Sequence, residues 1–396
     1  MKTAAIIAEY NPFHNGHAYQ INYLRGLGYD YIVIVMSGNF VQRGTAAFFP
    51  KEVRTKAALV CGADLVIELP LAFATASAES FAFGAVSILN ALGCIDALCF
   101  GCECDDLSLL TQLSQIENNP QFISVLRKNL DSGLPYHTAR SKTCARLLAD
   151  SEKVVNQPNN ILAIEYLKAL QKLNSPIKAL PLLRKGVEHD ASHTAQDIAS
   201  ASYLRAQAAG DNKQILAAYV PKKADALYNQ AFCTGAYLNP HSFEIAMLSR
   251  LRSLTLLQWG QVKNISEGLE NAFYRAAQQA CTLEELYTCV KTKRYPHARL
   301  RRLTLHAALE ITCNSPLTIP YIHVLGSSAG GFNLLKSCKQ NSCLPVSHSL
   351  RSLHGLNPIC AQFAQAEYNA TALYNLCLQS PRAAATDYTT KFIKIL

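Results

Sequence analysis

Residues 3–20 read TAAIIAEYNPFHNGHAYQ, and this segment indicates the class of the fold. It opens with an apolar run typical of a short buried strand. The pair Asn11-Pro12 then predicts a turn, because proline fixes its own backbone and restricts the residue before it. Gly16 adds no side chain, and a helical pattern starts near His17. A strand, a turn and a helix in this order predict a ligand-binding turn of an α/β domain.

The two histidines of this turn indicate its chemistry. Free N–H groups and the positive dipole end at the start of a helix attract anions. His14 and His17 flank Gly16, so both imidazoles can donate hydrogen bonds to a phosphate during its transfer. The alternative is a pair of surface histidines that cap a helix. Because the turn joins a strand to a helix, we favour phosphate binding and expect both histidines to be catalytic.

Outward from the turn, the first half alternates strands and helices. The predicted strands are residues 3–8, 31–36, 64–69, 97–100 and 178–183. The predicted helices are residues 18–27, 50–61, 77–92, 106–116, 120–130, 138–148 and 161–172. Apolar, β-branched runs that alternate with helices predict an α/β fold with a Rossmann-like doubly wound parallel sheet.

Ligands of such sheets bind beyond the carboxyl ends of the strands. Polar or glycine-rich segments do follow four of the five predicted strands. They are residues 11–17, residues 37–44, Gly101 and Arg184, whereas Pro70 follows the third strand without such a group. The sequence therefore predicts one site at this edge of the sheet.

The second half has a different pattern. From about Asp225 it shows helical periodicity over residues 240–256, 268–279, 283–291 and 297–311, and residues 319–325 are its one strand candidate. We expect a catalytic domain over residues 1–215 and a mainly α-helical, basic domain over residues 216–396. Charge supports this division. Residues 1–210 hold 18 basic and 18 acidic residues, and residues 211–396 hold 19 and 10. A neutral half and a basic half predict chemistry in the first and an anionic macromolecule on the second.

Cysteine usage and hydropathy bear on the compartment. The 14 cysteines are scattered singly, which favours reduced core residues over a disulfide framework. Cys102-Glu103-Cys104 lacks a second matched pair, so no metal site is expected there. The N-terminal apolar run is too short for a signal peptide, and no window of about 18 residues is free of polar interruptions. We expect a cytoplasmic protein without a membrane span.

The histidine turn resembles the HIGH motif of the nucleotidyltransferase superfamily. That superfamily pairs the motif with a later Ser/Thr-rich element that ends in arginine, and IASASYLR, residues 198–205, fits this pattern. By this resemblance Ser200 and Arg205 join the catalytic set, with the serine at a helix start and the arginine on the far phosphate of a triphosphate. The alternative is a serine-rich helix cap without catalytic function.

A closer resemblance covers most of the chain. The motifs AEYNPFHNGH, MSGNFVQRG, GADLVIELP, CFGCE, QPNNILAIEYLKAL, KRYPHAR and YIHVLG, in this order, resemble the bacterial tRNA(Met) cytidine acetate ligase family. The resemblance implies that ATP activates acetate as acetyl-adenylate, with release of pyrophosphate. The acetyl group then passes to N4 of the wobble cytidine, position 34, of elongator tRNA(Met). The implied partners are ATP, acetate and this tRNA, and Mg²⁺ is expected with the triphosphate.

The resemblance also implies an ATP-binding set. Its main part is the continuous segment Ile7, Ala8, Glu9, Tyr10, Asn11, Pro12, Phe13, His14, Asn15, Gly16, His17, Ala18, Tyr19 and Gln20. Gly101, Asn159 or Asn160, and Arg184 complete it. One of the two asparagines is expected to cap a helix. Arg184 is either a phosphate ligand or part of a surface ion pair, and we favour the ligand.

Two further groups of residues are candidates for substrate contacts. Asn39, Gln42 and Arg43 can donate hydrogen bonds to acetate or to the nucleotide, although an ordinary polar loop is the alternative. A basic cluster is expected to bind tRNA phosphates, with its tyrosine stacked on an unpaired base, although basic helices are more often only solvated. Its members are Lys291, Lys293, Arg294, Tyr295, Arg299, Arg301 and Arg302.

The chain departs from the family pattern at three places. Thr45 stands where glutamate is expected, residues 184–190 diverge, and His323 stands where arginine is usual. These changes affect loop and tRNA contacts and leave the phosphate motifs intact. Two other functions stay open at this point. One is a small-molecule adenylyltransferase of cofactor synthesis, and the other is a non-catalytic RNA-binding protein on the same scaffold.

Overall fold

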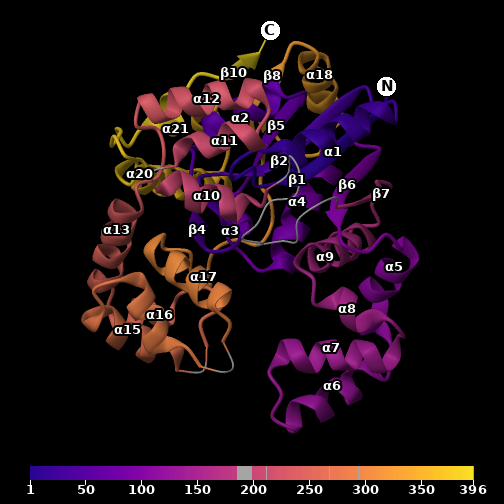
Figure 1. Ribbon diagram of the computed structural model, residues 1–396, viewed down its shortest axis with the longest axis vertical. Coiled ribbons are helices and arrows are strands. Elements are labelled where there is room, and N and C mark those ends of the chain that lie inside the picture. Colours follow the sequence, from indigo (N-terminus) through magenta and orange to yellow (C-terminus); the bar gives the residue numbers. More distant parts are fainter. Residues whose placement is uncertain (185–198, 211, 267, 293–294, 396) are drawn as a thin grey trace.

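The five apolar runs of the first half form the centre of one sheet (Figure 1). The structure is a computed structural model that describes residues 1–184, 199–210, 212–266, 268–292 and 295–395. The five strands run parallel in the order β5-β2-β1-β6-β7, which confirms the predicted doubly wound sheet. They are β1 (Thr3–Ala8), β2 (Tyr31–Ser37), β5 (Leu65–Leu69), β6 (Ala97–Cys102) and β7 (Lys178–Leu183).

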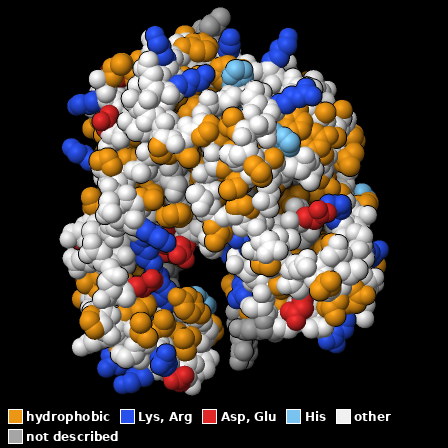
Figure 2. All heavy atoms as spheres, turned by 180° about the vertical axis from the view of Figure 1, so that it is seen from behind, with side chains coloured by type: hydrophobic (Ala, Val, Ile, Leu, Met, Phe, Trp, Pro, Cys, Tyr) orange, Lys and Arg blue, Asp and Glu red, His pale blue; other side chains and the backbone are white. Residues whose placement is uncertain are grey.

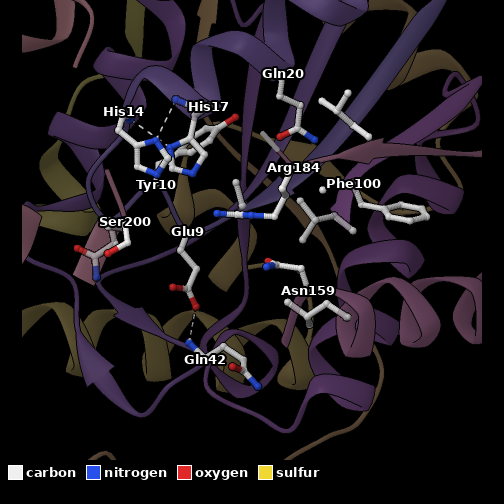
Figure 3. A pocket seen from close by; sticks show the side chains of 18 of the residues that line it. Glu9, Tyr10, His14, His17, Gln20, Gln42, Phe100, Asn159, Arg184 and Ser200 are labelled. Atoms are coloured by element: carbon white, nitrogen blue, oxygen red, sulfur yellow. Dashed lines mark hydrogen bonds between the residues drawn. The ribbon is translucent and has the colours of Figure 1, made fainter. Parts of the chain in front are cut away.

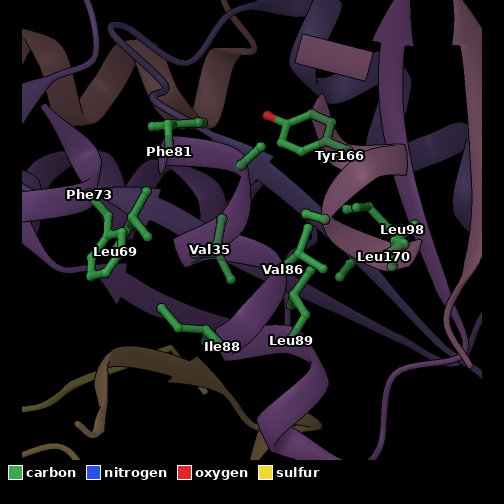
Figure 4. Packing of buried hydrophobic residues seen from close by; sticks show 14 of the residues in the cluster. Val35, Leu69, Phe73, Phe81, Val86, Ile88, Leu89, Leu98, Tyr166 and Leu170 are labelled. Atoms are coloured by element: carbon green, nitrogen blue, oxygen red, sulfur yellow. The ribbon is translucent and has the colours of Figure 1, made fainter. Parts of the chain in front are cut away.

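Both faces of this sheet are buried, which explains why its strands are almost wholly apolar. Successive residues of a strand point to opposite faces. In β2, Val33 and Val35 therefore enter one core, and Ile32 and Ile34 enter the other. The first core, shown in Figure 4, packs Val35 and Leu98 of the sheet against helices on that side.

Helices cover the two faces in the doubly wound manner. The helices α4 (Ala78–Leu92) and α9 (Pro158–Lys172) pack on one face, and α1 (Asn15–Gly26), α2 (Lys51–Val60) and α12 (Lys222–Cys233) on the other. Local sequence sets the ends of α4. Ser77 accepts a hydrogen bond from the Ser80 backbone N–H at 3.4 Å, and Gly93 ends the helix at φ 64°.

Two helical parts project from the same side of the sheet (Figure 1). The arm, inserted between β6 and α9, contains α5 (Leu107–Gln115), η1 (Ile116–Asn118), α6 (Phe122–Asp131), α7 (Tyr136–Leu147) and α8 (Ser151–Val155). The helical lobe contains α13 (Pro240–Ser253), α14 (Leu256–Gly260), α15 (Leu269–Gln279), α16 (Leu283–Val290) and α17 (His297–Ala308). The lobe has its own core, in which Trp259 stacks on Phe273 with ring centroids 5.1 Å apart.

The region over residues 216–396, which the sequence predicts to be mainly α-helical, also contributes strands to the sheet after residue 321. There β8 (Ile322–Ser328) pairs antiparallel with β5, and β9 (Val346–Ser347) and β10 (Ile393–Ile395) pair with β8. Sequence periodicity missed β9 and β10 because two or three residues are too few to show a pattern. The helices of this part are α18 (Gly331–Asn341), α19 (Leu350–His354), α20 (Pro358–Leu376) and α21 (Thr386–Thr389).

A hairpin links the sheet to the helical lobe. It consists of β3 (Phe40–Val41) and β4 (Thr45–Ala46), and Gly44 in its turn has φ 76°. A Cβ on Gly44 would lie 2.5 Å from the backbone nitrogen of Arg302, so α17 packs directly on this turn. The remaining elements are α3 (Leu71–Ala74), α10 (Ala201–Ala209), η2 (Lys213–Ile215) and α11 (Leu216–Tyr219).

A buried ionic cluster holds the C-terminal strands on the sheet. The Lys51 ammonium lies 2.8 Å from Glu68 and 2.9 Å from Asp387, and His323 Nδ1 lies 2.7 Å from Glu68. Burial disfavours the Glu68 carboxylate, but Lys51 and His323 outweigh this effect and lower its pKa to about 2. His323, which departs from the family pattern, therefore contacts a charged partner within the core.

A second buried cation joins the exits of the first two strands. The Arg54 guanidinium is fully buried and donates hydrogen bonds to the carbonyls of Glu9 at 2.6 Å, Ser37 at 3.0 Å and Phe49 at 2.9 Å. It also donates to the Gly38 carbonyl. One side chain thus satisfies four backbone acceptors in the loops that border the strand exits.

We predict that Arg54→Met lowers the free energy of unfolding by about 3 kcal/mol or more, because it leaves buried carbonyls without donors. Urea unfolding followed by circular dichroism measures the change. Arg382→Met is the matched control, since Arg382 pairs with Glu52 at 2.9 Å and is 33% exposed. We expect that control to cost less than about 1 kcal/mol. Equal losses in the two variants would contradict the role given to Arg54.

Candidate functional site

A pocket opens at the carboxyl ends of β1, β6 and β7 (Figure 3). Strand order reverses between β1 and β6, which is the position where ligands bind in doubly wound sheets. The pocket is lined by Ile7, Ala8, Glu9, Tyr10, Asn11, His14, Gly16, His17, Tyr19, Gln20, Gln42, Arg43, Phe81, Phe100, Gly101, Asn159, Leu162, Tyr166, Leu182, Leu183, Arg184, Ser200, Ala201, Ser202 and Arg205. Most of the residues that sequence reasoning selected therefore share one cavity.

The two histidines are locked together at the start of α1. His14 Nδ1 accepts a hydrogen bond from the Gly16 N–H, and His17 Nδ1 accepts one from the His14 N–H, each at 3.1 Å. Their rings stack with centroids 3.7 Å apart. Because both Nδ1 atoms are acceptors, a neutral ring must carry its proton on Nε2. Helix capping and anion binding, which the sequence left as alternatives, are thus compatible in one arrangement.

The environment keeps both rings neutral. Burial lowers the pKa of His14 to about 3, and the charges of Arg184 and Arg205 add to this shift. Burial, together with His14 and Arg184, also lowers the pKa of His17. Two neutral imidazoles with Nε2–H donors can stabilise negative charge on an oxygen without giving up a proton.

The second predicted element lies beside the histidine turn. Ser200 caps α10 by accepting a hydrogen bond from the Tyr203 N–H at 3.1 Å, and its oxygen lies 3.1 Å from that of Ser202. Arg205 donates to the carbonyl of Asn11 at 2.6 Å, across 194 positions of sequence. The starts of α1 and α10 thus border the same pocket, which makes this wall suited to an anion.

The two asparagines at the start of α9 have different positions. The Asn160 side chain is fully buried and its oxygen accepts hydrogen bonds from the N–H groups of Glu103 and Cys104 at 2.8 and 3.1 Å. Glu103 in turn accepts from the Asn160 N–H at 2.9 Å and from the Asn159 amide. Only Asn159 of the pair lines the pocket. Asn160 therefore fixes the start of α9.

Gly101 and Arg184 are neighbours in the wall formed by β6 and β7. A Cβ on Gly101 would lie 3.4 Å from Cγ of Arg184, so the glycine leaves room for the arginine side chain. The Arg184 N–H donates to the Cys102 carbonyl at 2.9 Å and continues the strand pairing. Arg184 thus enters the pocket from a fixed backbone.

Four residues of the predicted ATP segment do not line the pocket, namely Pro12, Phe13, Asn15 and Ala18. Phe13 is fully buried, and its backbone exchanges hydrogen bonds with the Tyr228 hydroxyl at 2.9 and 3.2 Å. These contacts hold the turn against α12. These four residues of the predicted segment therefore lie behind the lining of the pocket, because a turn presents only some of its side chains to one side.

The loop after β2 also places only some of its predicted side chains in the lining of the pocket. Gln42 and Arg43 line the pocket, but Asn39 does not. The Asn39 side chain is buried, accepts from the Lys51 N–H at 2.8 Å and donates to Thr371 at 3.2 Å. Asn39 therefore supports the start of α2, and its side chain lies outside the lining of the pocket.

Sequence reasoning missed the apolar wall of the pocket. This wall consists of Phe81, Phe100, Leu162, Tyr166 and Leu182. In the sequence these residues resemble ordinary core positions of helices and strands, and only the place of Phe100 near a strand exit could have indicated it. An apolar wall opposite polar groups suits a flat aromatic ring such as a purine.

Only some side chains of the predicted tRNA-binding cluster are accessible at the surface. Lys291 is exposed, and Arg299, Arg301 and Arg302 are half-buried on α17. Tyr295 is buried in the core of the lobe, so the expected stacking of its ring on an RNA base is wrong. Lys293 and Arg294 lie outside the described residues. Figure 2 shows Lys and Arg side chains on both sides of the notch between the arm and the helical lobe.

Among the described residues, no group of three or more His, Cys, Asp or Glu side chains could hold a metal ion. Among the helices of the described part, none has the length and apolar character needed to cross a membrane.

Known proteins resemble the chain over nearly its full length. The sequence model of the HIGH Nucleotidyl Transferase family matches residues 1–388. The tRNA(Met) cytidine acetate ligase of Acetivibrio thermocellus is 37% identical and covers 99% of this chain and 100% of its own length. That of Clostridium perfringens is 38% identical, with 88% and 90% coverage. The crystal structure of Thermotoga maritima TmcAL bound with alpha-thio ATP has a TM-score of 0.90 at 28% identity, and all of both chains is covered.

We predict that His14 makes the stability of the fold depend on pH. An unfolded histidine has a pKa near 6.5, so below that pH the unfolded chain binds a proton that the folded site refuses until about pH 3. The free energy of unfolding should therefore fall with falling pH, by up to about 1.4 kcal/mol per pH unit for this ring. Urea unfolding of the wild type and of His14→Asn between about pH 5 and 6.5 measures it. Equal slopes would contradict the neutral state.

Proposed function

Because the chain belongs to the HIGH nucleotidyl transferase family, and within it to the tRNA(Met) cytidine acetate ligases, we propose that it acetylates N4 of the wobble cytidine of elongator tRNA(Met). The enzyme is an ATP-dependent tRNA ligase. The observation that carries the proposal is the stacked pair His14 and His17, neutral and facing a pocket that also holds Arg184 and Arg205. A tRNA substrate agrees with the cytoplasmic location expected from the sequence.

In the first step, a carboxylate oxygen of acetate attacks the α-phosphorus of ATP, and pyrophosphate leaves. His14 and His17 donate Nε2–H hydrogen bonds to phosphate oxygens as charge moves toward the leaving group. Arg184, Arg205 and the start of α10 at Ser200 bind the rest of the triphosphate. Asn159 and the apolar wall hold the nucleoside.

Gln42 and Arg43 are the proposed contacts for acetate. Both line the pocket, and their turn lies across from the histidines. Mg²⁺ is proposed to enter with the triphosphate, since such ions are commonly held by phosphates and one or two carboxylates. The phosphates would provide most of its ligands, because the described lining of the pocket is poor in carboxylates.

In the second step, the cytidine amine attacks the acetyl carbon and AMP leaves. The RNA is proposed to lie against α17, where Arg299, Arg301 and Arg302 come from one helix. This helix packs on the hairpin whose turn borders the pocket, so RNA bound there is close to the adenylate. If the protein were a small-molecule adenylyltransferase, the basic lobe would have no role. If it were a non-catalytic RNA-binding protein, the pocket would have no role.

One incubation separates the three functions. The protein is mixed with ATP, labelled acetate and bulk tRNA, and each component is omitted in turn. We expect acetate-dependent release of pyrophosphate and label in tRNA. His17→Asn should lower pyrophosphate release about 100-fold or more, because one charge-stabilising donor is lost. His137→Asn, an exposed histidine of the arm, is the control. Release that needs another small acceptor supports an adenylyltransferase, and no release supports a binding protein.

We predict that Arg301→Gln with Arg302→Gln weakens tRNA binding and lowers its dependence on salt. Each lost phosphate contact should reduce the slope of log affinity against log salt concentration by about 0.7 to 0.9. Filter binding of tRNA at several salt concentrations measures both quantities. Lys339→Gln, an exposed cation on α18 at the opposite end of the molecule, is the control. A slope equal to that of the wild type would exclude these two arginines from the RNA interface.

A further inference from the structure

Glu9 is the one carboxylate among the described residues that line the pocket. The other charged groups there are Arg43, Arg184 and Arg205, which suit ATP and acetate because both are anions. A carboxylate repels such substrates. We therefore expect the Glu9 carboxylate to act on a group that carries a positive charge or that loses a proton in the reaction.

The structure fixes this carboxylate on a definite wall. Glu9 Oε1 accepts a hydrogen bond from the Gln42 N–H at 2.9 Å, and the Glu9 carbonyl accepts one from Arg54 at 2.6 Å. Figure 3 shows the side chain directed away from His14 and His17 and toward Gln42. The phosphate-binding groups and Glu9 thus face the pocket from different sides.

The wall that holds Glu9 is also the wall next to the helical lobe. Gln42 and Gly44 belong to one turn, and Gly44 packs against the backbone of Arg301 and Arg302. A base delivered along α17 would therefore reach the pocket on the side of Glu9. The Glu9 carboxylate is therefore expected to lie nearer to the incoming cytidine than to the phosphates.

We propose that Glu9 is the general base of the acetyl-transfer step, an inference that rests on the proposed function. The acceptor amine must lose a proton, because the exocyclic nitrogen of cytosine bears two hydrogens and the amide product bears one. As the bond from N4 to the acetyl carbon forms, the bond from that carbon to the phosphate oxygen of the adenylate breaks and AMP leaves. The N4 proton passes to a Glu9 carboxylate oxygen and then to solvent.

The test measures the two steps separately in the full-length enzyme. Acetate-dependent exchange of labelled pyrophosphate into ATP, without tRNA, reports formation of the adenylate. Single-turnover transfer from enzyme-bound labelled acetyl-adenylate to tRNA reports the second step. We expect Glu9→Gln to lower the transfer rate about 100-fold or more, and at least 30 times more than the exchange rate. Glutamine is isosteric and can still accept from the Gln42 N–H.

Two further variants separate catalysis from a purely structural effect. Glu9→Asp keeps a carboxylate and is expected to retain at least about a tenth of the transfer rate. Glu52→Gln is the matched control, because Glu52 pairs with Arg382 at 2.9 Å outside the pocket.

Each outcome has one meaning. If Glu9→Gln lowers exchange and transfer equally, the carboxylate acts on ATP or on its metal ion, and the proposal is overturned. If neither rate changes, it is overturned as well. If the wild type exchanges no pyrophosphate with acetate, the proposed function itself fails, and the proposed base fails with it.

Discussion

The structure depends on a buried cation, Arg54, whose guanidinium has no anionic partner within hydrogen-bonding distance among the described residues. Arg54 gives its buried N–H groups to four carbonyls. They belong to Glu9 after β1, to Ser37 and Gly38 at the end of β2, and to Phe49, two residues before α2. Backbone acceptors in a dry interior need donors, and here one rigid fork supplies them to loops that lack regular pairing. The direction of the Glu9 backbone follows from this arrangement, and so does the position of the hairpin turn that borders the pocket.

The loops that Arg54 holds in place help to form a pocket whose walls differ in chemical character. Stacked neutral imidazoles and two helix starts form a wall suited to phosphates. Aromatic and aliphatic side chains form a wall suited to a flat ring, and Glu9 with the Gln42 turn forms the third wall. The separation matters because the proposed reaction handles an anion first and an amine second. A single pocket can serve both only if the groups that favour each are kept apart.

The sequence was sufficient for the parts in which local pattern and fold agree. All five central strands could be predicted, because apolar runs are local features. The expectation that Arg205 lies near the histidine turn came from the family resemblance, and in the structure Arg205 donates to the Asn11 carbonyl of that turn. The sequence predicts ligand contacts for Asn39 and Tyr295 and leaves Asn160 as one of two candidates, whereas the structure buries all three side chains. The sequence does not show whether the partner of a polar or aromatic side chain is a substrate or a distant group of the same chain. The same limit hid β9 and β10, which are too short to leave a pattern.

The place of β8 in the sheet has a consequence for how the chain is made. Glu68 at the end of β5 meets His323 of β8, 255 positions later in the sequence. On the ribosome, the strand beside β2 must therefore wait with an unpaired edge while the arm and the whole helical lobe are synthesised. Such edges invite pairing with other chains. During this time the edge of β5 is open to aggregation, and binding by a chaperone would protect it. Glu68 also has no His323 to pair with until β8 has been synthesised.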